Sequence, residues 1–96
     1  MKNDILGELW QVIDDRFRNE NADSYVSRLF RDKKGIDRVL EKVGEESTEF
    51  IIAVKNGDHS RTVSEAADLQ FHLMVALRAA GVEFEEVCNE LASRRR

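Results

Sequence analysis

The chain has 96 residues and a formal net charge of −4 at pH 7. Domains commonly run to about 100–150 residues, so we expect residues 1–96 to form a single domain with a modest core. The acidic balance argues against nucleic acid as the main partner. No apolar run approaches the roughly 20 residues of a transmembrane span, and the start of the chain lacks an apolar secretory segment, so we expect no membrane partner and no export signal.

The composition favours an all-α fold, because the chain has no proline and only five glycines and is rich in alanine, leucine, glutamate and arginine. We expect a small helical domain of about four to five helices, with a core of the four-helix-bundle type, assembled as a homodimer. The one cysteine, Cys88, excludes an internal disulfide and suits the reducing cytoplasm.

The first predicted helix covers about residues 4–17, where apolar residues recur at helical spacing. Residues 18–23 are polar and predict a loop, after which Ser24 is a suitable N-cap for a short helix that reaches Phe30. Residues 31–35 form a basic link that ends in glycine. This link is either a solvated turn, the commoner case, or a source of lysines such as Lys34 that bind phosphate.

A third helix is predicted over about residues 36–56. At about 100° per residue, Lys42, Glu46 and Glu49 fall within roughly 60° of one another, and Glu45 lies beside Glu49. This acidic stripe adjoins the apolar face, whereas a charge run that only aids solubility prefers the far side of a helix. Its position predicts a groove against a neighbouring helix.

A fourth helix is predicted over about residues 61–80, where Glu65, Asp68 and His72 share one stripe. Residues 69–77 are apolar on nearly every side, which is typical of a buried helix. In so small a domain, full burial requires a partner subunit, so we expect a homodimer that forms through this helix. His72 either belongs with the acids or is a hydrogen-bonded, half-buried histidine.

A last helix is predicted over about residues 83–94, with Phe84, Val87, Cys88 and Leu91 on one face. Cys88 lies on this apolar face without an obvious base nearby, so we interpret it as a core residue. No internal repeat or low-complexity segment interrupts the helical pattern.

The acids on the third and fourth helices indicate a cation site. Neighbouring like charges weaken a helix by about 0.2–0.5 kcal/mol per pair, and a bound divalent cation offsets that cost. Mg²⁺ binds through a few carboxylates together with substrate phosphates. If the two helices form an antiparallel pair, their acidic stripes can face each other. We therefore predict Mg²⁺ as the cofactor, held by Glu46, Glu49, Glu65 and Asp68.

A Mg²⁺ ion at this position favours hydrolysis of a polyphosphate, which depends mostly on positioning and on neutralising charge. Glu45 completes the site or orients a water, and Lys42 and Lys55 flank the cluster, where they can hold the leaving phosphates. The sequence has no phosphate-binding glycine loop, nucleophile elbow or zinc-ligand spacing. An ExxE pattern followed by ExxD is common in helical proteins. The prediction of a cation site is therefore supported mainly by the doubled Glu45-Glu46 and by the apolar face that adjoins the acidic stripe.

At these residues the chain resembles the phosphoribosyl-ATP pyrophosphatases of histidine biosynthesis, a family within the MazG-type nucleotide pyrophosphatases, which share the ExxE and ExxD signature. The similarity extends from the first helix to Leu91. It includes DSY at 23–25, LF at 29–30, KG at 34–35, KVGEE at 42–46 with Glu49, EAADL at 65–69 and HL at 72–73. The KVGEE segment is more specific than the superfamily signature.

The resemblance implies Mg²⁺-dependent hydrolysis of the α–β phosphate bond of 1-(5-phosphoribosyl)-ATP, which gives 1-(5-phosphoribosyl)-AMP and pyrophosphate in the second step of histidine biosynthesis. It also implies an α-helical homodimer, here without a fused cyclohydrolase domain. By this resemblance the metal ligands are Glu46, Glu49, Glu65 and Asp68. Catalysis falls to Glu45 and Glu46. The implied substrate contacts are those of Ser24, Tyr25, Lys34, Lys42 and Lys55.

Two other functions are compatible with the pattern. A housekeeping MazG-type enzyme would use the same carboxylates to destroy unwanted nucleoside triphosphates, although Ser24-Tyr25 and the whole-length similarity argue against it. A non-catalytic helical dimerisation module would carry the acids only for solubility. In that case, neutralising Glu49 or Asp68 would leave stability unchanged or raise it, with no activity to lose.

Overall fold

The computed structural model describes residues 4–95, which form five α-helices and no strand. The helices are α1 (Ile5–Arg18), α2 (Tyr25–Phe30), α3 (Ile36–Lys55), α4 (His59–Ala79) and α5 (Phe84–Ser93). This arrangement confirms the predicted all-α fold. Residues 1–3, at the start of the chain where we looked for a secretory segment, and Arg96 lie outside the described residues.

The helix boundaries follow from capping groups. Ser24 caps α2, because its Oγ accepts a hydrogen bond from the amide three residues further on, at 3.2 Å. Asp58 caps α4 in the same way, accepting from the Arg61 amide at 3.0 Å, so this helix begins at His59, slightly before the predicted start. Gly57, with a φ of 67°, allows the chain to turn between α3 and α4.

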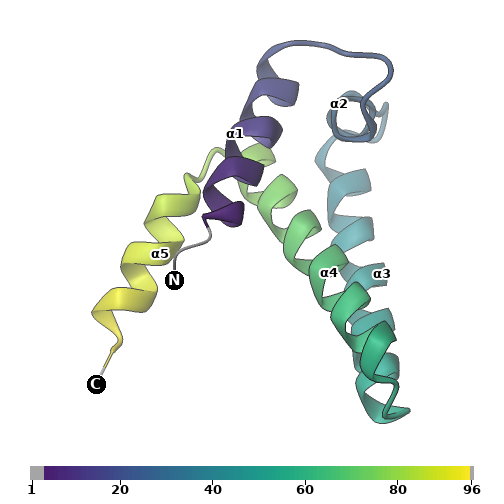
Figure 1. Ribbon diagram of the computed structural model, residues 1–96. Coiled ribbons are helices and arrows are strands. Elements are labelled where there is room, and N and C mark those ends of the chain that lie inside the picture. Colours follow the sequence, from purple (N-terminus) through teal and green to yellow (C-terminus); the bar gives the residue numbers. More distant parts are fainter. Residues whose placement is uncertain (1–3, 96) are drawn as a thin grey trace.

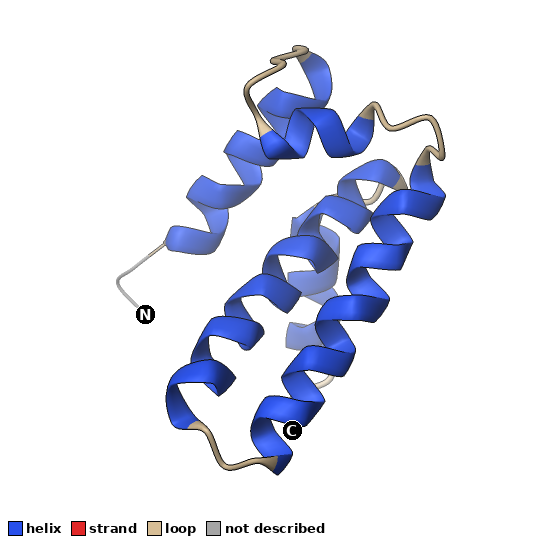
Figure 2. Ribbon diagram, turned by 90° about the vertical axis from the view of Figure 1, so that its right-hand side faces the viewer, coloured by secondary structure: helices blue, strands red, loops and turns tan. Residues whose placement is uncertain are grey.

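The antiparallel helices α3 and α4 form a hairpin, which is one arm of a V-shaped molecule (Figure 1). The other arm contains α5 and the start of α1, while α2 lies at the end of the hairpin where α3 begins (Figures 1 and 2). The buried core draws side chains from the first four helices, namely Ile13, Val26, Leu29, Val39, Met74 and Val75. Because α3 and α4 pack along their length, their acidic stripes come to lie on adjoining helices.

The basic link between α2 and α3, residues 31–35, is a turn whose first residue has a structural role. The guanidinium of Arg31 donates hydrogen bonds to the carbonyl oxygens of Arg16 and Phe17, at 2.9 and 3.0 Å. These carbonyls belong to the last turn of α1, where a helix leaves acceptors without intrahelical partners. Arg31 therefore ties the end of α1 to the link.

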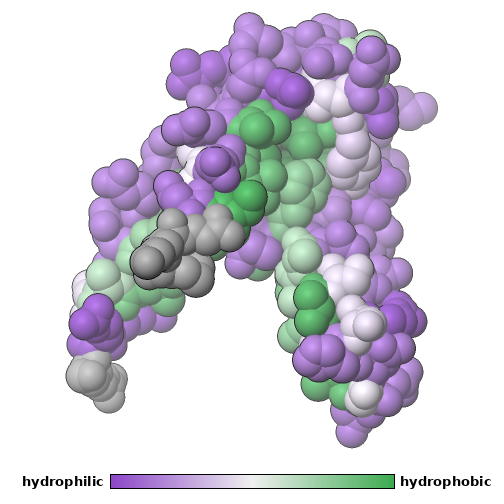
Figure 3. All heavy atoms as spheres, in the orientation of Figure 1, coloured by the Kyte–Doolittle hydropathy of each residue, from purple (hydrophilic) through white to green (hydrophobic). Residues whose placement is uncertain are grey.

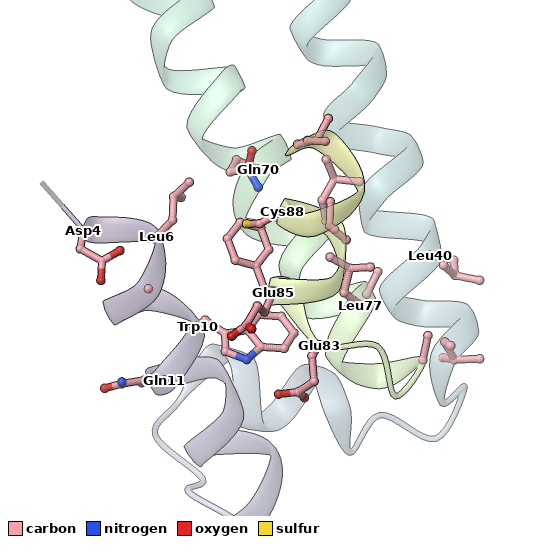
Figure 4. A pocket seen from close by; sticks show the side chains of 18 residues that line it. Asp4, Leu6, Trp10, Gln11, Leu40, Gln70, Leu77, Glu83, Glu85 and Cys88 are labelled. Carbon is pink, nitrogen blue, oxygen red and sulfur yellow. The ribbon is translucent and has the colours of Figure 1, made fainter. Parts of the chain in front are cut away.

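An apolar groove of about 1160 Å³ opens between the two arms (Figures 3 and 4). Leu6, Trp10, Leu77 and Phe84 line it, and the rings of Trp10 and Phe84 stack with their centroids 5.9 Å apart. Cys88 also lines the groove and is exposed, and no residue of α5, all of which the structure describes, is buried. The interpretation of Cys88 as a core residue is therefore wrong, because the groove beside it is open. Despite these apolar surfaces, none of the helices within residues 4–95 has the length and hydropathy needed to cross a bilayer.

Candidate metal and catalytic site

Three of the predicted metal ligands lie together between α3 and α4. Glu46, Glu49 and Glu65 each present a carboxylate oxygen, and these oxygens lie within 4.8 Å of one another. Glu46 and Glu65 are buried, with 7% and 8% of their surface exposed, whereas Glu49 is exposed. Converging carboxylate oxygens are the ligands that Mg²⁺ and Ca²⁺ prefer. The two acidic stripes therefore meet, as their spacing predicts.

Asp68, the fourth predicted ligand, lies one helical turn beyond Glu65 but is not in this group of three. The pKa of its carboxyl is raised, first by partial burial and then by the negative charges of Glu46 and Glu65. Asp68 therefore lies at the edge of the carboxylate cluster, close enough to be affected by its charge.

The carboxylate cluster has an excess of negative charge. The pKa of Glu49 is raised, first because its protonated carboxyl can donate a hydrogen bond to Glu46, and then by the negative charges of Glu46 and Glu65. Glu46 Oε2 is buried and has no hydrogen-bond donor among the residues that the structure describes. Burying a carboxylate oxygen without a donor or a cation is costly. The residues present therefore fit a hard divalent cation.

Lys42 is the basic side chain that sequence reasoning placed beside these acids. Its Nζ lies 3.5 Å from Glu45 Oε1 and 3.5 Å from Glu46 Oε1. Burial lowers the pKa of Lys42, but the proximity of Tyr25, Glu45 and Glu46 outweighs burial and makes the net shift upward. Lys42 is therefore held in its charged form at the edge of the cluster.

Sequence reasoning missed two arginines beside the site. Arg61 Nη2 lies 2.9 Å from Glu65 Oε2, and Arg38 Nη1 lies 3.6 Å from Glu45 Oε2. Arg61 and Glu65 are separated by one helical turn, a pairing that the sequence contained. Glu45, which the resemblance assigns to catalysis, pairs with Arg38 and Lys42 and is not one of the three converging carboxylates.

Of the other two predicted lysines, Lys34 lies in the link before α3 and Lys55 is the last residue of this helix. Lys34 Nζ lies 3.1 Å from Glu41 Oε2, and hydrogen bonds from Lys34 and then Arg38 lower the pKa of Glu41. Lys55 is exposed in the last turn of α3, six residues after Glu49 and so about 9 Å further along the helix axis. Within the described residues, Lys42 is the predicted lysine that pairs with a carboxylate of the cluster.

Ser24 and Tyr25 lie at the start of α2, near the end of the α3–α4 hairpin. Ser24 Oγ caps α2, whereas the Tyr25 hydroxyl lies 2.9 Å from His72 Nε2. His72 Nδ1 is 2.8 Å from the carbonyl oxygen of Asp68, and only 5% of the His72 surface is exposed. Of the two alternatives for His72, the structure shows the buried, hydrogen-bonded histidine.

Residues 6–95 match the family model described as phosphoribosyl-ATP pyrophosphohydrolase. The chain belongs to this family. It is 58% identical over 92 residues to the phosphoribosyl-ATP pyrophosphatase of Methanoculleus marisnigri, covering 96% of this chain and 95% of that protein. It is 60% identical over 92 residues to the protein of the same name from Methanoregula boonei, covering 96% and 88% of the two chains. These comparisons confirm the resemblance inferred from the sequence motifs.

In this member of the phosphoribosyl-ATP pyrophosphohydrolase family, positively charged side chains pair with the glutamates of the site. The converging carboxylates can hold a cation, and Lys42, Arg38 and Arg61 place positive charge beside them. Glu45 has 53% of its side chain exposed and can accept a proton from water. The arrangement is suited to binding a cation together with a polyphosphate.

Proposed function

We propose that this chain is a Mg²⁺-dependent enzyme of the cytoplasm, acting as one domain over residues 1–96. It hydrolyses 1-(5-phosphoribosyl)-ATP to 1-(5-phosphoribosyl)-AMP and pyrophosphate, the second step of histidine biosynthesis. The observation that carries the proposal is the convergence of Glu46, Glu49 and Glu65, with a buried Glu46 oxygen that lacks a donor among the described residues. The substrate is supported by the name of relatives that are 58% and 60% identical over 96% of this chain.

In the proposed mechanism the metal ligands are Glu46, Glu49, Glu65 and Asp68. When bound, Mg²⁺ supplies positive charge to phosphate oxygens and makes water more acidic. Glu46 also orients the attacking water, and Glu45 accepts its proton. The water oxygen bonds to the α-phosphorus, the bond to the bridging oxygen breaks, and pyrophosphate leaves with the electron pair.

The proposed substrate contacts differ in how strongly the geometry supports them. Lys42 is supported best, because its ammonium group lies 3.5 Å from Glu46, one of the three converging carboxylates. Lys34 would have to leave Glu41 to reach a phosphate, while Lys55 lies beyond the cluster. Of the residues at the start of α2, Ser24 is half-buried and its Oγ caps the helix, whereas Tyr25 is exposed.

We also propose that two copies of the chain form a homodimer by covering the apolar groove. The groove combines a volume of about 1160 Å³ with large apolar side chains that a single chain leaves exposed, Leu40 by 50% and Leu73 by 41%. A groove lined by large exposed apolar side chains is a common feature of protein–protein interfaces. The part of the largely apolar stretch of α4 that a single chain leaves exposed, such as Leu73, gains a buried environment in this arrangement.

The test of the activity is pyrophosphate release by the purified chain with Mg²⁺, comparing phosphoribosyl-ATP with a panel of ordinary and deoxynucleoside triphosphates. We expect turnover of phosphoribosyl-ATP alone, lost in Glu49→Gln. The matched control is Glu90→Gln, whose carboxylate pairs with Arg94 at 2.8 Å on α5 and which should retain activity.

Two results would contradict the proposal. Turnover of the panel but not of phosphoribosyl-ATP would assign the chain to the housekeeping MazG-type enzymes. If no substrate releases pyrophosphate while circular dichroism shows an intact helical fold, only the interpretation as a non-catalytic dimerisation module would remain.

A further inference from the structure

The buried His72 has no part in the mechanism above, yet it connects two parts of the candidate site. Its Nδ1 lies 2.8 Å from the carbonyl oxygen of Asp68, and its Nε2 lies 2.9 Å from the hydroxyl of Tyr25, which is 47 residues away in the sequence. Only 5% of His72 is exposed, and the Tyr25 ring stacks with Phe71 at a centroid distance of 6.2 Å. These contacts hold the Tyr25 hydroxyl beside the stripe of α4 that carries the carboxylates.

The hydrogen-bond partners determine which atom carries each proton. A backbone carbonyl oxygen only accepts, so the proton of the neutral His72 imidazole is on Nδ1 and Nε2 has a free lone pair. The Tyr25 hydroxyl must then donate its proton to Nε2. Its oxygen keeps its capacity to accept, and 42% of Tyr25 is exposed. The hydroxyl can therefore accept a hydrogen bond from a ligand but has no proton left to donate.

A hydroxyl that can only accept is poorly suited to phosphate, because phosphate oxygens are acceptors as well. It is suited to a hydroxyl group, and the ribose hydroxyls are the donors that lie close to the phosphates in a nucleotide. Phosphate contacts fall instead to the cations beside the cluster, Lys42, Arg38 and Arg61. We propose that Tyr25 accepts a hydrogen bond from a ribose hydroxyl of the substrate. His72 is the positioning residue, because it takes the hydrogen bond that the Tyr25 hydroxyl donates and leaves that hydroxyl only its acceptor role. This inference rests on the proposed function, because it takes the nucleotide as the substrate.

The experiment measures kcat and KM for phosphoribosyl-ATP and for analogues in which one ribose hydroxyl at a time is replaced by hydrogen. For the wild-type chain, one analogue should have a KM about three- to tenfold higher, the value of one neutral hydrogen bond. In Tyr25→Phe, phosphoribosyl-ATP and that analogue should have the same KM. In His72→Leu, where the hydroxyl is no longer held in place, the difference in KM should be smaller than in the wild-type chain. The effect of each variant should fall more on KM than on kcat, because the contact is to the sugar and not to the reacting phosphorus.

The conservative variant His72→Gln separates positioning from packing. Its amide oxygen can accept the Tyr25 proton in place of Nε2, so the hydroxyl preference should return. The double variant Tyr25→Phe/His72→Leu should be no worse than Tyr25→Phe alone, because His72 acts on the substrate only through the Tyr25 hydroxyl. Tyr25 is the one tyrosine in the chain, so 3-fluorotyrosine labelling gives a single ¹⁹F resonance that should move in His72→Leu and return toward wild type in His72→Gln.

Several outcomes would overturn the inference. If His72→Leu lowers the melting temperature but keeps the hydroxyl preference and the ¹⁹F resonance, His72 is only a packing residue. If every analogue has the wild-type KM in the wild-type chain, Tyr25 contacts no ribose hydroxyl. Absence of any turnover of phosphoribosyl-ATP by the wild-type chain would overturn the proposed function together with this inference, whereas turnover without a hydroxyl preference overturns the inference alone.

Discussion

The carboxylate cluster and the apolar groove both involve the α3–α4 hairpin, and they are unfavourable in a single chain for opposite reasons. In the cluster, Lys42 and Arg61 pair with the buried Glu46 and Glu65, but three carboxylates converge and one Glu46 oxygen has no donor among the described residues. In the groove, Leu40 and Leu73 are apolar groups that are exposed. A buried charge needs a counter-ion, and exposed apolar surface needs another apolar surface. The same hairpin therefore has two regions that need a partner. A cation would neutralise the carboxylate cluster, and a second copy of the chain would cover the apolar groove.

The largest expected effect comes from breaking the cluster at its buried member. Glu46→Gln keeps the shape of the side chain but removes the charge, and it should lower kcat/KM for phosphoribosyl-ATP by about 10²–10³-fold. Pyrophosphate release measures this loss, with circular dichroism to show that the helices remain. Near-wild-type activity in Glu46→Gln, or an equal loss in Glu90→Gln, would contradict the role of the cluster.

Breaking the groove should separate the subunits and leave the cluster intact. Leu73→Glu places a charge on the apolar surface and should raise the dimer dissociation constant by at least about 30-fold, the effect of removing an interface hot spot. Sedimentation equilibrium measures the constant. The control Asn89→Glu adds the same charge on the exposed side of α5 and should leave it unchanged. A wild-type chain that is monomeric at every concentration would refute the dimer.

The cluster could be predicted from the sequence because it depends on local spacing. Two helices with acids at intervals of three residues bring those acids onto one face each, and the turn at Gly57 makes the helices antiparallel. The all-α class followed for the same reason, since composition and helical periodicity are local properties. The predicted boundaries were close because capping residues such as Ser24 and Asp58 are visible in the sequence.

Contacts between distant segments could not be predicted in this way. The spacing of residues 83–94 shows that Cys88 is on an apolar face, but not that this face borders an open groove. The basic link gave no sign that Arg31 would bind the end of α1, because its acceptors are 14 and 15 residues earlier. The contact between His72 and Tyr25 could not be predicted for the same reason, because the two residues are 47 positions apart in the sequence. These contacts depend on how the helices pack, which single-residue patterns do not specify.

A smaller effect is expected where a carboxylate already has its cation. Arg78 Nε lies 2.7 Å from Asp14 Oδ1, and its hydrogen bond is the main reason that the pKa of Asp14 is lowered. The charged form of Asp14 therefore stabilises the fold above the ordinary pKa of about 3.8, and this stability is lost as the pH falls through the lower folded-state pKa. Asp14→Asn should lower the free energy of unfolding by about 1 kcal/mol at pH 7. Urea unfolding at pH 7 and below pH 3 measures the difference, which should shrink in acid; a constant difference would contradict it.

The smallest effect should have the opposite sign, because Glu49 lacks such a cation in the metal-free protein. Its pKa is raised by Glu46 and Glu65, so its charged form opposes folding once the pH rises above the ordinary value of 4.5 and through the raised folded-state pKa. In EDTA, Glu49→Gln should therefore melt at a higher temperature than the wild-type chain at pH 7, with the difference vanishing below about pH 4. Added Mg²⁺ should raise the melting temperature of the wild-type chain more than that of Glu49→Gln, since binding to the folded state stabilises it. Two results together would contradict the cation site: a lower melting temperature of Glu49→Gln than of the wild-type chain without metal, and no effect of Mg²⁺ on the melting temperature of either chain. The carboxylates would then be paired within the protein.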